Sequence, residues 1–298
     1  MTDKPHLDGG AGPAAGNTPQ VLEHEVQGAD PRVASELLAL LSGLPRARVK
    51  DAMVKGAVWL RRPGAGGGER RLRRASTELR AGDRVAIYYD PRILDLDPPA
   101  AVCLADREAY SVWHKPAGLL AQGTRYGDHA SLLRQAEKAR GRPRPVFPVH
   151  RLDREASGLM LVAHTHAAAR TLTAELALDS TEKVYRAEVR GDLAARHGDR
   201  GRIDLPLDGR TALTEYRVLG YDPGADASRV EVRIHTGRLH QIRRHLAALG
   251  CAVLGDPRYG RGNADPRGLR LVATRLALRC PVAHRPVTFD LPADLSPF

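Results

Sequence analysis

The sequence predicts an α+β protein in which a mainly antiparallel sheet with helices follows a smaller α/β unit. From residue 105 onward, short apolar strand patterns alternate with helical patterns. The stretches 184–190 and 229–235 alternate apolar and polar residues, which is typical of an antiparallel sheet with one buried face. The length of 298 residues suits one large domain and one small domain.

The first 104 residues are expected to hold a tail, the small unit and a linker. Residues 1–18 are rich in Gly, Ala and Pro and predict a disordered tail. Residues 19–90 predict the small unit, and the stretch 91–104, which contains several prolines, predicts a linker. Gly56 marks a turn in the small unit, and 63–68 a glycine-rich hairpin. The other expected elements are helices at 34–41 and 45–53 and strands at 57–60 and 86–89.

Residues 105–298 are expected to form the large domain. Thr165 is placed to cap the N-terminus of a helix at 166–178, and Gly250 to end a helix at 239–249. The other expected elements are a helix at 131–140 and strands at 109–114, 158–163, 184–190, 213–221 and 229–235.

The composition favours a polyanionic partner such as nucleic acid. The formal net charge is +11 and the sequence pI about 10.0. Of the 46 basic residues only six are Lys, so 40 are Arg, whose planar guanidinium suits phosphates and bases. A GC-rich genome would produce the same bias, and a basic, solvated surface remains the alternative.

Cysteine usage and hydropathy predict a cytoplasmic protein. Cys103, Cys251 and Cys280 are widely spaced and form no Cys-x-x-Cys pair, so neither a disulfide framework nor a zinc site is expected. No stretch approaches the roughly 20 apolar residues of a membrane span, and the N-terminus lacks an apolar signal core.

One segment carries the strongest indication of chemistry. His150-Arg151-Leu152-Asp153 places a carboxylate just before Ser157-Gly158 and the apolar run 159–163, which predicts a buried strand. A carboxylate beside basic groups at the start of a strand suits chemistry on a polyanion. The alternative is a surface turn in which Asp153 pairs with a neighbouring Arg.

These residues resemble the central motif of the RluA-like family of RNA pseudouridine synthases, in which His-Arg-Leu-Asp precedes Thr-Ser-Gly. The chain departs from the family at Ala156, where Thr is usual, and at Val272, where His is usual. Five further stretches resemble family motifs in the same order: Lys115-Pro116-Ala117-Gly118, Lys183-Val184-Tyr185, Ala212 to Tyr216, Thr236 to Leu246, and Gly255 to Gly260.

The small unit resembles the RNA-binding domain first described in ribosomal protein S-four. The matching features are an Arg-x-Arg helix, a Lys-Gly-Ala-Val turn and a Gly-Asp-x-Val strand, whereas the usual Val-Asn-Gly is missing. The two resemblances imply a curved, mixed but mainly antiparallel sheet with flanking helices and a central cleft. A small α/β RNA-binding domain would precede it in the sequence. Arg46, Arg48, Lys50 and Lys55 would then clamp RNA phosphates, or simply form a solvated helix face.

The family resemblance assigns the chemistry of uridine isomerisation, which needs no nicotinamide, metal or ATP. Asp153 would act as a nucleophile or as a base, and Arg243 would keep it ionised. Tyr185 would stack on the base and move a proton, unless it is a core tyrosine. Arg151 would fill the gap left by the flipped base. The remaining implied roles are loop ordering for His150 and Lys115, and RNA or loop contacts for Lys183, Arg238 and His240.

Two other functions compete with this interpretation. Ala156 and Val272 leave open a non-catalytic RNA-binding factor in ribosome assembly, although Asp153, Tyr185 and Arg243 argue against it. Asp153 and Glu155 would be the carboxylate pair of a glycosidase, which fits the basic charge poorly. Among RNA targets, the small N-terminal unit favours large-subunit ribosomal RNA over transfer RNA, and a monomer is expected.

Overall fold

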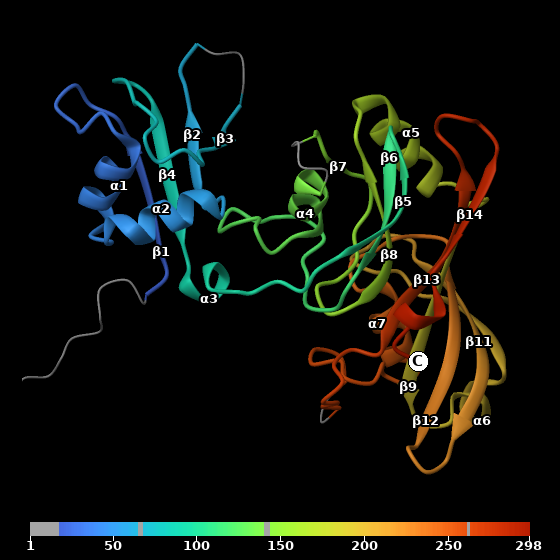
Figure 1. The fold of residues 1–298 in the computed structure, drawn as a ribbon. Coiled ribbons are helices and arrows are strands. Elements are labelled where there is room, and N and C mark those ends of the chain that lie inside the picture. The colour runs from blue at the N-terminus through green and yellow to red at the C-terminus, as the bar shows by residue number, and fades with distance from the viewer. Residues whose placement is uncertain (1–17, 65–67, 140–143, 261–262) are drawn as a thin grey trace, which may run out of the picture. The chain divides into compact units, whose positions relative to one another are not determined.

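The computed structural model describes residues 18–64, 68–139, 144–260 and 263–298 (Figure 1). The predicted tail therefore lies almost wholly outside the described residues, as does part of the hairpin 63–68. The chain divides into two compact units. One ends at Asp97 and also takes in Gly123–Ala130, and the other comprises Pro98–Gln122 and Ser131–Phe298.

The first unit is a four-stranded antiparallel sheet covered by two helices. The strand order is β1-β4-β2-β3, and β4 pairs with β1 and β2. One face of the sheet packs its apolar side chains against α1 and α2 in a single core that includes Leu37, Met53 and Ile87. The elements are β1 (Gln20–Glu25), α1 (Ala34–Ser42), α2 (Arg46–Val54), β2 (Val58–Arg61), β3 (Arg70–Arg71), β4 (Arg84–Tyr89) and α3 (Pro91–Leu94).

Two features of this unit differ from the sequence-based prediction. The expected linker begins with helix α3, because the Asp90 side chain caps it and a proline fits the first turn of a helix. Gly123–Ala130, expected in the large domain, belongs here because its backbone bonds to this unit. The indole of Trp59 donates to the carbonyl of Arg125 (3.0 Å), and the amide of Asp128 donates to that of Lys55 (2.9 Å). The likeness to the S-four domain stays a prediction.

The second unit is built on one large, mainly antiparallel sheet of ten strands among the described residues. The order is β10-β11-β12-β9-β13-β8-β6-β5, with β14 beside β13 and β7 beside β8. The pair β13 and β8 is parallel. The strands are β5 (Val102–Arg107), β6 (Tyr110–Lys115), β7 (Phe147–Pro148), β8 (Ser157–Ala163), β9 (Glu182–Arg190), β10 (Arg200–Asp204), β11 (Leu213–Asp222), β12 (Ala227–Ile234), β13 (Leu271–Arg279) and β14 (Pro286–Asp290).

Helices flank this sheet. Helix α5 packs on β7, β8 and β13, whereas α6 and α7 pack on the β10–β11 side. The Thr165 hydroxyl accepts a hydrogen bond from the Ala168 amide (3.1 Å), which confirms the predicted N-cap. Gly250 follows α7 with a positive φ of 71°, as a helix stop requires. The helices are α4 (Leu132–Lys138), α5 (His166–Leu176), α6 (Leu193–His197), α7 (Gln241–Ala248) and the 3₁₀ turn Ala293–Leu295.

Gly158 lets the two halves of the sheet meet. Its φ is +116°, and a Cβ there would overlap the backbone nitrogen and oxygen of Ala273 in β13. Only glycine combines this conformation with so close an approach. The parallel contact is short, Val272 with Ser157 and Ala273 with Gly158, so it is confined to the start of β8, directly after the loop that precedes this strand. In the described part of the chain, no helix is long and apolar enough to cross a membrane.

Candidate active site

The loop 149–156, between β7 and β8, carries Asp153. Leu152 and Ala156 are buried and anchor the loop on either side of it, whereas the Asp153 side chain keeps 14% of its surface exposed. The backbone amide of Leu161, in β8, donates to Nε2 of His150 (2.8 Å) and fixes the start of the loop. The loop therefore presents one carboxylate from an otherwise anchored backbone.

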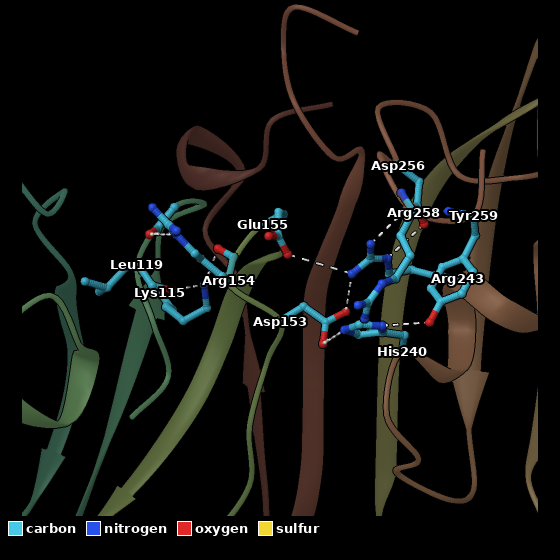
Figure 2. A network of polar contacts seen from close by, with 11 residues as sticks. Lys115, Leu119, Asp153, Arg154, Glu155, His240, Arg243, Asp256, Arg258 and Tyr259 are labelled. Carbon is cyan, nitrogen blue, oxygen red and sulfur yellow. Dashed lines mark hydrogen bonds and ion pairs between the residues drawn. The ribbon is translucent and has the colours of Figure 1, made fainter. Parts of the chain in front are cut away.

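Arg243 of α7 faces Asp153 from the other half of the sheet. Its Nη1 donates to Oδ2 of Asp153 at 3.0 Å and lies 3.7 Å from an oxygen of Glu155. Figure 2 shows the Asp153 carboxylate directed at Arg243 and His240. The structure therefore brings together the expected pair of Asp153 and Arg243.

Asp256 holds the rest of the Arg243 guanidinium. Nε and Nη2 of Arg243 donate to the two oxygens of Asp256, both at 2.8 Å, and the Asp256 side chain is fully buried. The backbone amides of Arg258 and Tyr259 also donate to Oδ1 of Asp256. Burial raises the pKa of this carboxyl, but the Arg243 and amide hydrogen bonds outweigh it, so the pKa is lowered. Burial likewise opposes the charge of Arg243, and its two carboxylate partners raise its pKa nonetheless.

His240 precedes α7 in a left-handed conformation, with φ at 52°. Its Nδ1 lies 2.9 Å from the hydroxyl of Tyr259, and its Nε2 lies 3.7 Å from Oδ1 of Asp153. Arg243 lies over the Tyr259 ring, 5.4 Å from its centre. His240 therefore faces the second oxygen of Asp153, so its imidazole is not directed toward solvent alone.

Lys115 ties the Lys-Pro-x-Gly loop to the loop of Asp153. Its Nζ is buried and donates to the carbonyls of Pro116 (3.0 Å), Leu119 (2.8 Å) and Arg154 (3.2 Å) (Figure 2). Burial lowers its pKa from 10.5 to about 7, although Asp153 and Glu155 act in the opposite direction. These contacts suit the expected buttressing role, because Arg154 directly follows Asp153.

A cavity of about 520 Å³ opens beside Asp153 and is also lined by Arg151, Tyr185, Arg238 and Arg243. Its size falls in the ordinary range of small-ligand sites. Tyr185 projects from β9, and burial followed by the Asp153 charge raises its pKa, so it stays a neutral phenol. No residue in the described part of the chain forms a hydrogen bond with the Tyr185 hydroxyl, which leaves it available to a ligand. Arg151 is exposed at the same cavity.

Two basic residues at the cavity also have structural partners. The Lys183 ammonium donates to the carbonyl of Leu176 (2.8 Å) at the end of α5, where a cation is favoured. Arg238 donates from Nε to the carbonyl of Thr211 (2.9 Å). Burial, followed by the charge of Lys183, lowers the pKa of His150 to about 4. A neutral His150 suits the expected ordering of the loop better than proton transfer.

The basic residues expected to clamp RNA lie on α2 and the turn after it, in the first unit. Arg46, Arg48 and Lys55 each form an ion pair with an acidic residue of that unit, at 2.8 to 3.0 Å. Lys50 is exposed and has no ion-pair partner among the described residues. Exposed ion pairs are weak, so phosphate can compete for these groups, and the clamp stays a prediction.

The two departures from the family motif are buried. Ala156 belongs to the core beneath β9 and α7, and Val272 lies in β13 opposite Ser157 of β8. Neither removes a charged group from the cavity. Within the described ranges, no cluster of three His, Cys, Asp or Glu residues could hold a metal ion.

Sequence reasoning gave no role to Asp256 or Tyr259. Both lie in the Gly255–Gly260 stretch, which matched a family motif, so the pattern could have singled them out as candidates. The folded turn brings Asp256 into contact with Arg243 and Tyr259 into contact with His240. The spacing of residues in the sequence does not reveal these contacts.

Known proteins resemble this chain over most of its length. Residues 109–248 match the RNA pseudouridylate synthase family. An uncharacterized RNA pseudouridine synthase of Aquifex aeolicus is 33% identical over 263 residues, 81% of this chain and 80% of the relative. The ribosomal large subunit pseudouridine synthase D of Zymomonas mobilis is 33% identical over 67% of this chain and 71% of its own. The dual-specificity RNA pseudouridine synthase RluA of Escherichia coli is 33% identical over 66% and 94%.

Solved structures share the fold over about two thirds of this chain. Human RNA pseudouridylate synthase domain containing 1 gives a TM-score of 0.53 at 24% identity, over 66% of this chain and 86% of that one. Human RNA pseudouridylate synthase domain containing 4 gives 0.51 at 22%, over 65% and 89%. These likenesses confirm the predicted fold, a mixed and mainly antiparallel sheet with flanking helices.

Proposed function

Because this chain belongs to the family of RNA pseudouridine synthases, we propose that it modifies uridines of large-subunit ribosomal RNA and that Asp153 is the carboxylate that acts on the nucleotide. The observation that carries the proposal is the Asp153–Arg243 ion pair (3.0 Å) in a cavity of about 520 Å³.

The reaction breaks the bond between C1′ of ribose and N1 of uracil, turns the base, and joins C1′ to C5. The proton of C5 leaves, N1 gains one, and the product is an isomer of the substrate. Asp153 contributes either as a nucleophile or as a base that removes a sugar proton. Both routes need an ionised carboxylate, and the guanidinium of Arg243 lies 3.0 Å from it as an ion-pair partner.

Tyr185 and Arg151 are the groups proposed to handle the base. Tyr185 lines the same cavity as Asp153 and presents a neutral ring, on which a base would stack with about 1–3 kcal/mol. Its free hydroxyl is placed to pass on the C5 proton. A target base must leave the RNA stack at a cost of a few kcal/mol, and the exposed guanidinium of Arg151 is flat enough to replace it.

The choice of large-subunit ribosomal RNA is supported by a relative and by the first unit. The Zymomonas mobilis relative is named for the large ribosomal subunit, whereas the Escherichia coli relative is named for dual specificity. The first unit adds an exposed basic helix, α2, with Arg46, Arg48 and Lys50, which suits a large, folded RNA.

The target is tested with RNA labelled with tritium at C5 of uracil and taken from cells that lack the gene. Ribosomal and transfer RNA are incubated separately with the enzyme, and released tritium is counted. Release from large-subunit ribosomal RNA alone supports the proposed target, and release from transfer RNA alone contradicts it. Free uracil among the products would indicate hydrolysis in place of isomerisation.

A further inference from the structure

Two side chains of the turn Asp256–Tyr259 reach Asp153 through separate intermediates. Asp256 contacts Arg243, which contacts Oδ2 of Asp153. Tyr259 contacts His240, which faces Oδ1 of Asp153. We propose that Asp256 and Tyr259 are positioning residues for pseudouridine synthesis, each fixing the group that addresses one oxygen of Asp153. The inference rests on the proposed role of Asp153.

The first relay fixes the plane of a guanidinium. Arg243 has three nitrogens, and Asp256 accepts from two of them, Nε and Nη2. Only Nη1 is left for Asp153. Asp256 cannot turn away, because the two amides of Arg258 and Tyr259 hold its Oδ1 and its side chain is fully buried. Without Asp256, Arg243 would be free to bind both oxygens of Asp153 and to hold the carboxylate away from the nucleotide.

The second relay fixes an imidazole and its tautomer. Burial lowers the pKa of His240 despite the nearby Asp153, and Arg243 and Arg258 act in the same direction as burial. A neutral His240 carries one proton. Because the Asp153 carboxylate faces Nε2 (3.7 Å), the tautomer with its proton on Nε2 is favoured, and Nδ1 then accepts a hydrogen bond from the Tyr259 hydroxyl (2.9 Å).

The backbone of His240 has an uncommon conformation. Its φ of 52° lies in the left-handed region, which is uncommon for a non-glycine residue. Among the groups that face its ring are Tyr259, Asp153, Arg243 and Arg258, with the more distant Glu155. The His240 side chain is only 14% exposed, which leaves little of the imidazole for contact with an RNA phosphate.

The experiment compares kcat and KM on labelled ribosomal RNA for Tyr259→Phe, Asp256→Asn and wild type. Tyr259→Phe removes one hydroxyl and keeps the ring beside Arg243. We expect kcat to fall about 3- to 10-fold for Tyr259→Phe and about 10- to 100-fold for Asp256→Asn, with KM unchanged. Tyr216→Phe is the matched control, because it also removes one tyrosine hydroxyl that has a hydrogen-bond partner, the carbonyl of His197 (3.0 Å). Its kcat should equal that of wild type.

A double-mutant cycle separates positioning from general support of the fold. His240→Asn shortens the side chain but tolerates the left-handed backbone. If Tyr259 acts through His240, Tyr259→Phe should have no further effect on kcat in the His240→Asn background. An equal fall in both backgrounds would overturn the role of Tyr259, and an increase in KM alone would show that these residues bind RNA instead.

Asp153→Asn, measured alongside, distinguishes the two levels of the proposal. An inactive Asp153→Asn with an unaffected Tyr259→Phe and Asp256→Asn would refute only the positioning roles. An active Asp153→Asn would refute the proposed function on which they rest.

Discussion

Replacing Arg243 by Met should leave a buried carboxylate without its counterion. The Arg243 side chain is 3% exposed and that of Asp256 0% exposed. Three hydrogen bonds join this guanidinium to two carboxylates, at 2.8 to 3.0 Å. Methionine has no charge and reaches about as far as Nε of arginine, so the change removes the electrostatic contacts and keeps the aliphatic part of the side chain.

The expected loss is about 3 kcal/mol in the free energy of unfolding. Removing one partner of a buried ion pair costs about 3–5 kcal/mol, because the other charge stays buried. The lower end applies here, since two backbone amides still donate to Asp256. Adding Asp256→Asn to Arg243→Met removes the unpaired charge, so the double variant should recover about 1–2 kcal/mol.

The assay is urea unfolding followed by tryptophan fluorescence. Trp113 is 4% exposed in β6 of the second unit, whereas Trp59 lies in the first unit. A Trp59→Phe background therefore makes Trp113 the reporter for the unit that contains Arg243. The reasoning is refuted if Arg243→Met lies within about 1 kcal/mol of its parent, or if the double variant is no more stable than the single one.

Three further changes test other parts of the structure. Burial lowers the pKa of His150 from 6.5 to about 4, so the unfolded chain binds a proton in this window that the folded protein excludes. The free energy of unfolding should therefore fall by up to about 3 kcal/mol as the pH drops from 6.5 to about 4. Urea unfolding should show this pH dependence in wild type and in the control His166→Gln, and His150→Gln should lack it. Lys115→Met removes a buried donor to three carbonyls and should lower the free energy of urea unfolding by about 2 kcal/mol, and an unchanged midpoint would contradict the buttressing role. Gly158→Ala forces a Cβ into the backbone of β13 at a φ of +116° and should cost about 3 kcal/mol in the same assay. Gly220→Ala, on a strand with room for the methyl group, should cost less than about 1 kcal/mol.

Much of the fold is predictable where local chemistry decides it. The alternating strands β9 and β12, the helix capped by Thr165 and the stop at Gly250 were all expected close to their observed bounds. Each of these features depends on residues that lie close together in the sequence.

The prediction failed where distant partners decide the structure. Strand β13 was not expected, although it lies between β8 and β9 in the sheet, because its parallel pairing with β8 depends on Gly158 far away in the sequence. The expected linker contains α3 because the Asp90 side chain caps this helix. Pro91 suggested a break in regular structure, but after an N-cap residue a proline fits the first turn of a helix.

The candidate site was predicted in part. Asp153, Tyr185 and Arg243, which come from three of the family motifs, line one cavity, and Asp153 and Arg243 are in contact. The partners of Arg46, Arg48 and Lys55 were not foreseen, since two of the three acidic residues lie at least ten positions away. Asp256 was also missed, because it accepts hydrogen bonds from Arg243 only once the turn Asp256–Tyr259 has folded.

Single-turnover tritium release by Asp153→Asn is the most direct test of the proposed role of Asp153. Asparagine keeps the shape of the aspartate side chain and an oxygen that can accept a hydrogen bond from Arg243 Nη1. It can act neither as a carboxylate nucleophile nor as a base. With C5-labelled ribosomal RNA, wild type should release tritium, and Asp153→Asn should release none while binding the RNA with about threefold or smaller change in Kd. Release by Asp153→Asn at a rate near that of wild type would show that another group performs the reaction.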